Sequence, residues 1–174
     1  CKKKQIITQN ISKEDITYSM KSNLTYTWYH YYQFIFTWLF NWKKFFDNDT
    51  EKFIIWCIPM LHRANKMRSL NNNHLPDISS WRLDIEKIET QGINTMSLAD
   101  ITGIPRPTVT RKLKSLIKNN HLTMDKQKLI HPGNQGKYKG EMYSIHDTAL
   151  NKFSEFSAKI FNQVILNQNS VLRQ

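Results

Sequence analysis

One run of twenty residues, SLADITGIPRPTVTRKLKSL from Ser97 to Leu116, holds the residue types and spacing that point most directly to a chemical role. Gly103 lies near its middle, and glycine readily adopts the positive φ that ends a helix and turns the chain. Pro105 and Pro107 follow, and proline is tolerated in the first turn of a helix, where its missing N–H has no helical partner. The run therefore predicts two short helices joined by a tight turn, the second over about 105–119.

The predicted second helix has one apolar side and one basic side. Val109, Leu113 and Leu116 recur at helical spacing and are expected to face inward. The opposite side carries Pro107 and three cations, Arg111, Lys114 and Lys118. The exposed first turn carries two further polar residues, Arg106 and Thr108. A basic helix after a tight turn is typical of a helix that enters the major groove of DNA. An ordinary helical hairpin with a solvated basic face is the alternative, and we favour DNA binding.

The run resembles the winged helix-turn-helix superfamily, and its pattern is close to that of IclR-type and MarR-type bacterial transcriptional regulators. The matching residues are Leu98, Ala99, Thr102, Gly103, Ile104, Pro105, Arg106, Thr108, Val109, Arg111, Leu113 and Leu116. The resemblance covers about 78–145, less than half of the chain. It implies a major-groove helix, a β-hairpin wing and usually a homodimer. Pro107 departs from the small polar residue common at its position, which argues against a base or phosphate contact there.

The expected DNA contacts divide by role. Base edges carry the sequence information, whereas phosphate contacts set register and affinity. We expect Arg106 and Thr108 at base edges and four residues of the helix-turn-helix at phosphates: Ser97, Thr110, Arg111 and Lys114. The wing would add lysines from one of two turns, either Lys126 and Lys128 or Lys137 and Lys139. The sequence leaves open which of the two turns is the tip of the wing.

The charge of the chain supports an anionic partner. The formal net charge is +11, with 25 Lys+Arg against 14 Asp+Glu. Residues 97–140 hold nine lysines and arginines against only Asp100 and Asp125, a net charge of +7 in a quarter of the chain. Such a cluster displaces counterions from DNA, so binding should weaken steeply as salt rises.

The N-terminal third is rich in aromatic residues. Over 24–46, apolar residues recur at alternating spacings of four and three and form one stripe: Trp28, Tyr32, Ile35, Leu39, Trp42 and Phe46. A second stripe lies beside it: Tyr31, Phe34, Trp38 and Phe45. A helix with so many aromatic residues must be buried on several sides. Its partner could be a helix over about 50–69, a C-terminal helix over about 147–167, or a second subunit.

MarR-type regulators pair such helices between subunits, so the resemblance implies a homodimer. The expected dimerisation residues are Trp28, Tyr32, Ile35, Leu39, Trp42, Phe156 and Ile160. A monomeric helical core is the alternative.

The expected fold is mainly α with a small β-hairpin wing, a winged helix-turn-helix flanked by dimerisation helices at both ends. Three regions follow: an N-terminal aromatic region over 1–70, a DNA-binding domain over 77–146, and a C-terminal helix over 147–174 that packs on the first region. The polar segment 71–76 is the boundary. Within the middle region we expect a helix over 79–91 and a closing strand at Met142 and Ile145.

Other chemistries find little support. No nucleophile motif, phosphate loop or metal-ligand spacing is present, so we expect neither an enzyme nor a bound cofactor or metal. The mean hydropathy of −0.57 and the polar residues within the aromatic segment argue against a membrane span. No apolar segment follows the first lysines, so we expect no signal peptide and a cytoplasmic location. Cys57, in an apolar stretch, is expected to be a buried, reduced thiol, although it could sense redox state.

Two alternatives to sequence-specific DNA binding remain: a protein-interaction module, and a non-specific nucleic-acid binder on the same scaffold. A small apolar effector could bind near Tyr31 or Trp38, but core packing is the preferred role of these rings.

Overall fold

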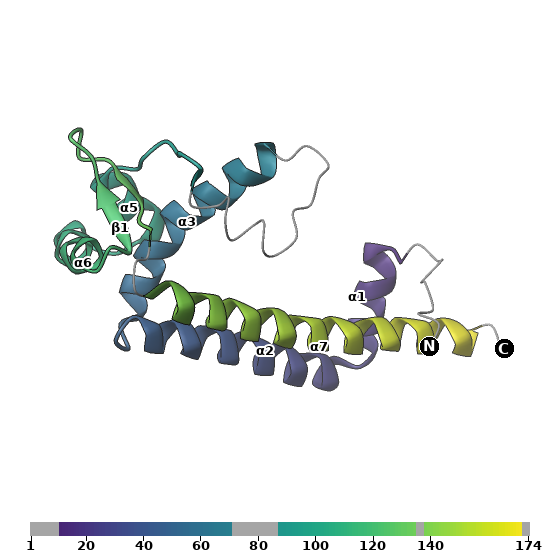
Figure 1. Cartoon of the computed structure of the whole chain (residues 1–174). Helices are drawn as coiled ribbons and strands as arrows, with labels where there is room; N and C mark the ends of the chain where they lie inside the picture. Colours follow the sequence, from purple (N-terminus) through teal and green to yellow (C-terminus); the bar gives the residue numbers. More distant parts are fainter. Residues whose placement is uncertain (1–10, 71–86, 135–137, 172–174) are drawn as a thin grey trace. The chain divides into compact units, whose positions relative to one another are not determined.

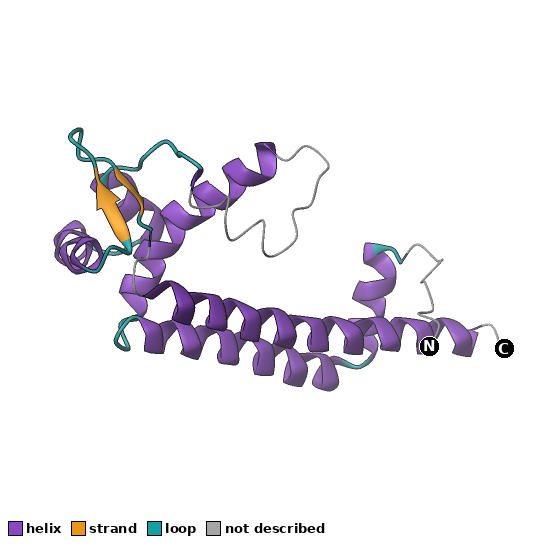
Figure 2. Cartoon of the chain, viewed as in Figure 1, coloured by secondary structure: helices purple, strands orange, loops and turns teal. Residues whose placement is uncertain are grey.

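The computed structural model describes residues 11–70, 87–134 and 138–171, with side chains described as far as Asn167. These residues are mainly helical, with one small antiparallel hairpin, as the sequence predicts (Figure 2). The chain forms two compact units. A helical unit comprises the residues up to Phe40 and those from Ser144 onward, and a central unit comprises Asn41–Tyr143.

The helical unit contains α1 (Lys13–Ser22), most of α2 (Leu24–Phe45) and most of α7 (Lys139–Val171). Within the unit α2 and α7 lie side by side (Figure 1). Aromatic rings fill the space between the two helices: Tyr31 contacts Phe156 with ring centroids 6.1 Å apart, and Phe34 contacts Phe153 at 5.4 Å. One of the two predicted stripes of α2 therefore packs inside the chain.

A different set of rings occupies the outer face of α2. Trp28, Tyr32, Phe36 and Phe40 follow one another at i, i+4 and stack in sequence, with centroids 5.2, 5.6 and 5.8 Å apart. Each of these four rings, which we call the aromatic ladder, remains 44–57% exposed. The ladder is therefore an apolar surface that the described residues leave about half exposed.

The central unit is built from α3 (Thr50–Leu70), α5 (Thr95–Thr102), α6 (Arg106–Lys118) and a hairpin of β1 (Leu122–Met124) and β2 (Ile130–Pro132). The antiparallel register places Leu122 opposite Pro132. Helix α3 packs against α5, α6 and β2, and α6 packs against α5 and β1. The helix α3 thus provides the platform on which the predicted helix-turn-helix and hairpin lie.

The core of the central unit has two parts. An aromatic cluster joins the end of α2 to α3 and consists of Trp42, Phe46, Phe53 and Trp56. Aliphatic side chains fill the space between the helices and the hairpin: Leu98, Val109, Leu113, Leu116, Leu122 and Ile130. All ten are almost fully buried, and such burial stabilises each large apolar side chain by about 1.5–3 kcal/mol.

Some expected boundaries need correction. Met142 and Ile145 lie in α7, which begins at Lys139, so the predicted closing strand is wrong. Their spacing of three is compatible with one face of a helix, and Gly140 lies in the first helical turn, where the N–H groups have no helical partner anyway. The C-terminal helix consequently starts at Lys139, before its expected start at about 147.

Two expectations fall on residues outside the described ranges. They are the predicted linker at 71–76 and most of the predicted helix over 79–91. The part of that helix that the structure does describe, residues 88–91, is not helical. Among the described residues, no helix has the length and apolar character needed to span a membrane.

Candidate nucleic-acid interface

The turn between α5 and α6 is defined by local hydrogen bonds. The Asn94 side chain caps α5 by accepting from the Ser97 N–H at 2.8 Å. At the other end, Gly103 adopts a left-handed conformation with φ 67° and donates its N–H to the Ala99 carbonyl at 2.9 Å. Ile104, which is 7% exposed, then fills the corner. The turn therefore forms as its residue types predict, because glycine adopts this φ without steric cost.

Helix α6 covers Arg106–Lys118, within one residue of the predicted bounds. Its apolar side, Val109, Leu113 and Leu116, is at most 2% exposed, which fixes the orientation of the helix. No side chain caps its start, because Pro105 holds the N-cap position. The N-terminal end of a helix carries partial positive charge, so this end is favourable to a phosphate.

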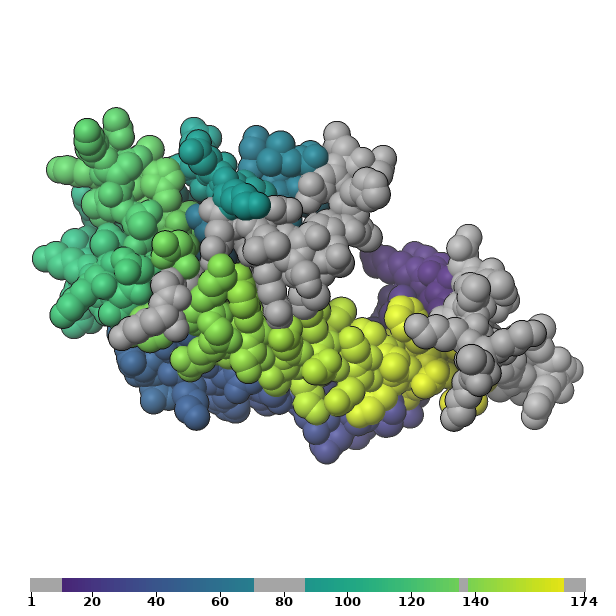
Figure 3. Space-filling view, viewed as in Figure 1, coloured from purple at the N-terminus to yellow at the C-terminus, as the bar shows by residue number. Residues whose placement is uncertain are grey.

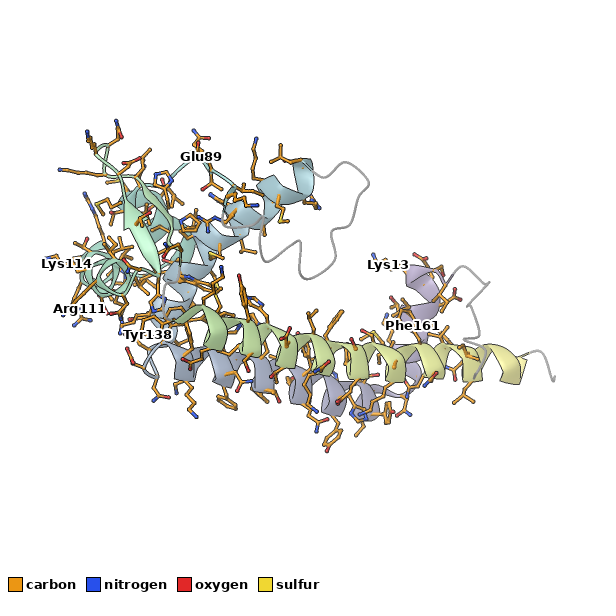
Figure 4. The ribbon with its side chains drawn as sticks, in the orientation of Figure 1. Lys13, Glu89, Arg111, Lys114, Tyr138 and Phe161 are labelled. Atoms are coloured by element: carbon orange, nitrogen blue, oxygen red, sulfur yellow. The ribbon has the colours of Figure 1, made fainter. Side chains whose placement is uncertain are left out.

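The surface of α6 outside its apolar side is exposed and basic. Arg106, Arg111, Lys114 and Lys118, which we call the basic face, are all exposed. Arg111 and Lys114 lie on the side of α6 that faces away from α3 (Figure 4). Within the described ranges, no carboxylate forms an ion pair with any of these four cations. Among the described residues, the basic face is thus a set of uncompensated positive charges on a helix whose apolar side is packed.

Lys112 is the exception among the cations of α6. Its ammonium lies between the carboxylates of Asp49 and Glu51 at the start of α3, and its Nζ is 2.9 Å from Glu51 Oε2. Burial opposes the charged forms, but the hydrogen bonds outweigh it, so the pKa of Lys112 is raised and the pKa of Asp49 is lowered. Lys112 therefore fixes α6 to α3 and does not belong to the basic face.

The hairpin turn Asp125–Lys128 carries two further exposed cations, Lys126 and Lys128. It joins β1 to β2, so this turn, and not the later turn-rich stretch, is the tip of the hairpin. In the space-filling view the turn forms a projection of the surface of the central unit (Figure 3). An isolated bridge between Ile93 and Ile130 places the chain before α5 on the other side of β2.

A buried arginine ties the end of the hairpin to α3. Arg63 is 7% exposed and donates from Nη2 to the Pro132 carbonyl at 2.8 Å, and from Nη1 to the Gly133 carbonyl at 3.4 Å. Because hydrogen bonds from a charged group are strong, this contact limits movement of the hairpin relative to α3. Sequence reasoning missed it, since nothing local in the sequence links residues 69 positions apart.

The remaining expected DNA contacts are placed less favourably. Ser97 and Thr108 are half-buried, and the Thr110 hydroxyl donates to the Arg106 carbonyl at 2.9 Å, so its proton is already engaged. Lys139 lies in the first turn of α7 with its Nζ 5.7 Å from the centre of the Tyr143 ring. Lys137 lies outside the described residues. The structure therefore places the basic face and the two hairpin lysines at the surface. Thr110 and Lys139 instead contact the Arg106 carbonyl and the Tyr143 ring.

The expected dimerisation residues also divide. Trp28 and Tyr32 are exposed members of the aromatic ladder, whereas Ile35, Leu39 and Phe156 are half-buried. Trp42 and Ile160 are 1% and 4% exposed, which leaves no surface for a second copy to contact. Phe36 and Phe40 were missed, although their i, i+4 spacing from Trp28 and Tyr32 is visible in the sequence.

Two cavities of the central unit are lined mainly by polar groups. One, of about 410 Å³, lies between α3 and residues 89–91, and the other, of about 320 Å³, adjoins Arg63 and Asn120. Such polar linings do not suit an apolar effector. Among the described residues, no group of three or more His, Cys, Asp or Glu side chains is arranged to hold a metal ion.

Comparisons with protein-family models, with curated proteins and with solved structures find no match to the chain. Its function is therefore inferred from the residues and the geometry of the central unit.

Proposed function

We propose that the chain is a sequence-specific DNA-binding regulator of transcription, with α6 as its recognition helix in the major groove. One observation carries the proposal: the basic face of α6 is exposed and uncompensated among the described residues, while the other side of the helix is fully packed. A helix held in this way presents fixed charges to phosphates and its first turn to base edges.

The scaffold of the proposal is a winged helix-turn-helix. The tight turn at Gly103, the hairpin that follows α6 and the Ile93–Ile130 bridge beside it support this assignment. The resemblance of the run from Ser97 to Leu116 to MarR-type and IclR-type regulators points in the same direction. In this arrangement the hairpin is the wing, and its turn lies beside the duplex.

The proposed contacts follow from position, and the cations among them are also exposed. Arg106 and Thr108, in the first turn of α6, contact base edges, and Arg111 and Lys114 contact phosphates. Ser97 approaches a phosphate from α5. Lys126 and Lys128 add backbone contacts from the wing, where an exposed lysine contributes affinity with little sequence preference.

We also propose that the regulator acts as a homodimer in the cytoplasm, with the aromatic ladder at the dimer interface. Four half-exposed rings present roughly 400 Å² of apolar surface, the size of the largest patch on a typical monomer, and patches of this size are often interaction sites. A stable interface buries about 800 Å² per partner, so the ladder would supply about half and its neighbours Leu24 and Tyr29, both more than half exposed, would supply part of the rest.

Selection from a random pool of duplex DNA at near-physiological salt, followed by sequencing, tests the proposal. We expect an enriched two-fold symmetric motif whose half-sites lie about one helical turn apart, because two recognition helices of a dimer enter successive major grooves. Absence of an enriched motif, with binding that vanishes as salt rises, would reduce the function to non-specific nucleic-acid binding.

A matched variant separates DNA binding from a protein-interaction role. Neutralising three members of the basic face together, Arg106→Ala, Arg111→Ala and Lys114→Ala, leaves the buried side of α6 intact. We expect this variant to fold and to lose DNA binding and any regulation of a reporter gene. Regulation that survives the triple substitution would favour a protein-interaction module.

A further inference from the structure

The hairpin turn is closed by one carboxylate. Asp125 Oδ1 accepts from the Leu129 N–H at 2.8 Å, and Asp125 Oδ2 lies 2.9 Å from His131 Nε2. The Asp125 N–H also donates to the Leu129 carbonyl at 3.0 Å, and the Lys128 N–H donates to the Asp125 carbonyl at 3.1 Å. One aspartate side chain thus joins both ends of the turn that carries Lys126 and Lys128.

The histidine of this pair is held in place from behind. A Cβ added to Gly92 would lie 2.6 Å from the Cε1 and Nε2 atoms of His131, so the ring packs directly on the backbone at Gly92. The next residue, Ile93, exchanges two backbone hydrogen bonds with Ile130, at 3.0 and 2.8 Å. The imidazole therefore has little freedom, and it provides a fixed anchor for the Asp125 carboxylate.

The turn itself adopts an unusual backbone conformation. Lys128 has a positive φ of 63°, a conformation that residues with a side chain seldom adopt. Such a conformation persists when the surrounding hydrogen bonds over-determine it. The hydrogen bond with His131, together with the Leu129 N–H, lowers the pKa of Asp125, so the carboxylate remains charged at neutral pH. Lys126 and Lys128 consequently lie on a turn of defined shape.

We infer that Asp125 and His131 are positioning residues, which hold Lys126 and Lys128 where they contact the phosphates of bound DNA. The inference rests on the proposed function. In this arrangement the pair itself touches no DNA and acts only through the two lysines. Lysines on a fixed turn lose less conformational freedom on binding than lysines on a mobile loop, which increases affinity.

The sign of one substitution distinguishes positioning from simple charge. A carboxylate close to phosphates repels them, so Asp125 as a mere surface charge would oppose binding, and its removal would strengthen the complex. As a positioning residue it favours binding, and its removal would weaken the complex. The two roles therefore predict opposite changes for Asp125→Asn.

The test measures binding of the full chain to a fluorescent duplex of about 30 base pairs by anisotropy, over a range of KCl concentrations. We expect Asp125→Asn to weaken binding about tenfold at near-physiological salt, and to reduce the salt slope by about one to two phosphate contacts. Asp100→Asn is the matched control, because it removes another exposed carboxylate of the central unit that has no described partner. The control should bind equally well or more tightly.

Three further variants exclude a merely structural effect. In a background of Lys126→Ala and Lys128→Ala, Asp125→Asn should cause no additional loss, because the lysines through which it acts are absent. His131→Gln should retain most of the affinity, since its amide N–H can still donate to Asp125, whereas His131→Ala should resemble Asp125→Asn.

The outcomes separate the inference from the proposed function. If the wild-type chain fails to bind duplex DNA, the proposed function is wrong and the inference falls with it. If the wild-type chain binds while Asp125→Asn binds equally or more tightly, as the Asp100→Asn control does, the inference alone is wrong. An equal loss in the presence and absence of the two lysines would also overturn it, because the loss would then come from damage elsewhere in the fold.

Discussion

Arg106 and Arg111 are both exposed cations of α6, one in its first turn and one in its middle. If the first turn reads base edges, Arg106→Ala should relax the preference at one base position and cost about 1–3 kcal/mol on the preferred site. Arg111→Ala should instead weaken binding to all sequences about equally and reduce the salt slope by about one, as expected of a phosphate contact.

Quantitative binding to the preferred duplex and to a set of single-base variants, at several salt concentrations, measures both effects. Lys118, in the last turn of α6, is the useful comparison because it is a cation far from the first turn. An unchanged base preference in Arg106→Ala would exclude this side chain from base recognition, even if overall affinity fell.

The thiol of Cys57 is predicted to be chemically inert in the folded chain. Burial raises its pKa to about 12, so the reactive thiolate is scarcely populated at neutral pH. In a Cys1→Ser background, which leaves Cys57 as the single thiol, reaction with a disulfide reagent at pH 8 should be at least tenfold slower in the native than in the urea-unfolded chain. Equal rates in the two states would restore Cys57 as a candidate redox sensor.

At the scale of elements, the start of α3 and the middle of α6 are joined by the Asp49–Lys112–Glu51 ion pairs. Asp49→Asn removes the charge but keeps an effective N-cap for the Lys52 N–H, which Asp49 Oδ1 accepts at 3.1 Å. The carboxylate remains partly exposed, so we expect the free energy of unfolding to fall by about 1 kcal/mol at pH 7. Asp47→Asn should have almost no effect, because Asp47 is an exposed partner of Lys52.

The pH dependence of this difference has a definite sign. The pKa of Asp49 is lowered in the folded chain, so its contribution is fully present above the ordinary aspartate pKa of about 3.9. The contribution is lost as the pH falls through the lower folded-state pKa. Urea unfolding of both proteins from about pH 7 to about pH 3 should therefore show their stabilities converging on the acid side. A gap that stayed constant over this range would mean that the charge of Asp49 is not responsible.

Elements specified by local chemistry could be predicted from the sequence, and those specified by distant contacts could not. Gly103 and the two prolines define the start of α6 within a few residues, and the turn after Met124 is local in the same way. The engagement of Lys112 by Asp49 depends on residues 63 positions apart, so the sequence counted this lysine with the basic region. The start of α7 was missed because turn-forming residues precede it and Met142 and Ile145 also fit a short strand.

At the scale of the whole chain, the distribution of apolar surface matters more than its amount. The sequence predicts that α2 is too aromatic to be exposed, and both of its predicted stripes are indeed partly packed against α7 or within the central unit. What remains is the aromatic ladder, which combines Trp28 and Tyr32 of the first stripe with Phe36 and Phe40, on the face that α7 leaves uncovered. Composition could not distinguish these sets, because each is rich in aromatic residues; the packing of α7 selects which rings face outward.

The aromatic ladder gives the homodimer a direct test. Phe36 is 47% exposed and contacts its ladder neighbours Tyr32 and Phe40, so Phe36→Glu should leave the chain folded while placing a charge at the centre of the proposed interface. Light scattering after size exclusion should give twice the chain mass of 20.7 kDa for the wild type and the chain mass for the variant. A charge buried opposite its own copy has no partner, which is costly.

Leu61→Glu is the matched control, because Leu61 is a 62% exposed apolar residue on α3, a helix that carries no member of the ladder, and this variant should remain dimeric. The monomeric variant should still bind a single half-site, with about half of the wild-type salt slope, since each copy carries its own recognition helix and wing. A wild-type chain that is monomeric at all accessible concentrations would remove the dimer from the proposal and leave the ladder for a different partner. A Phe36→Glu variant that remains dimeric would place the interface on another surface.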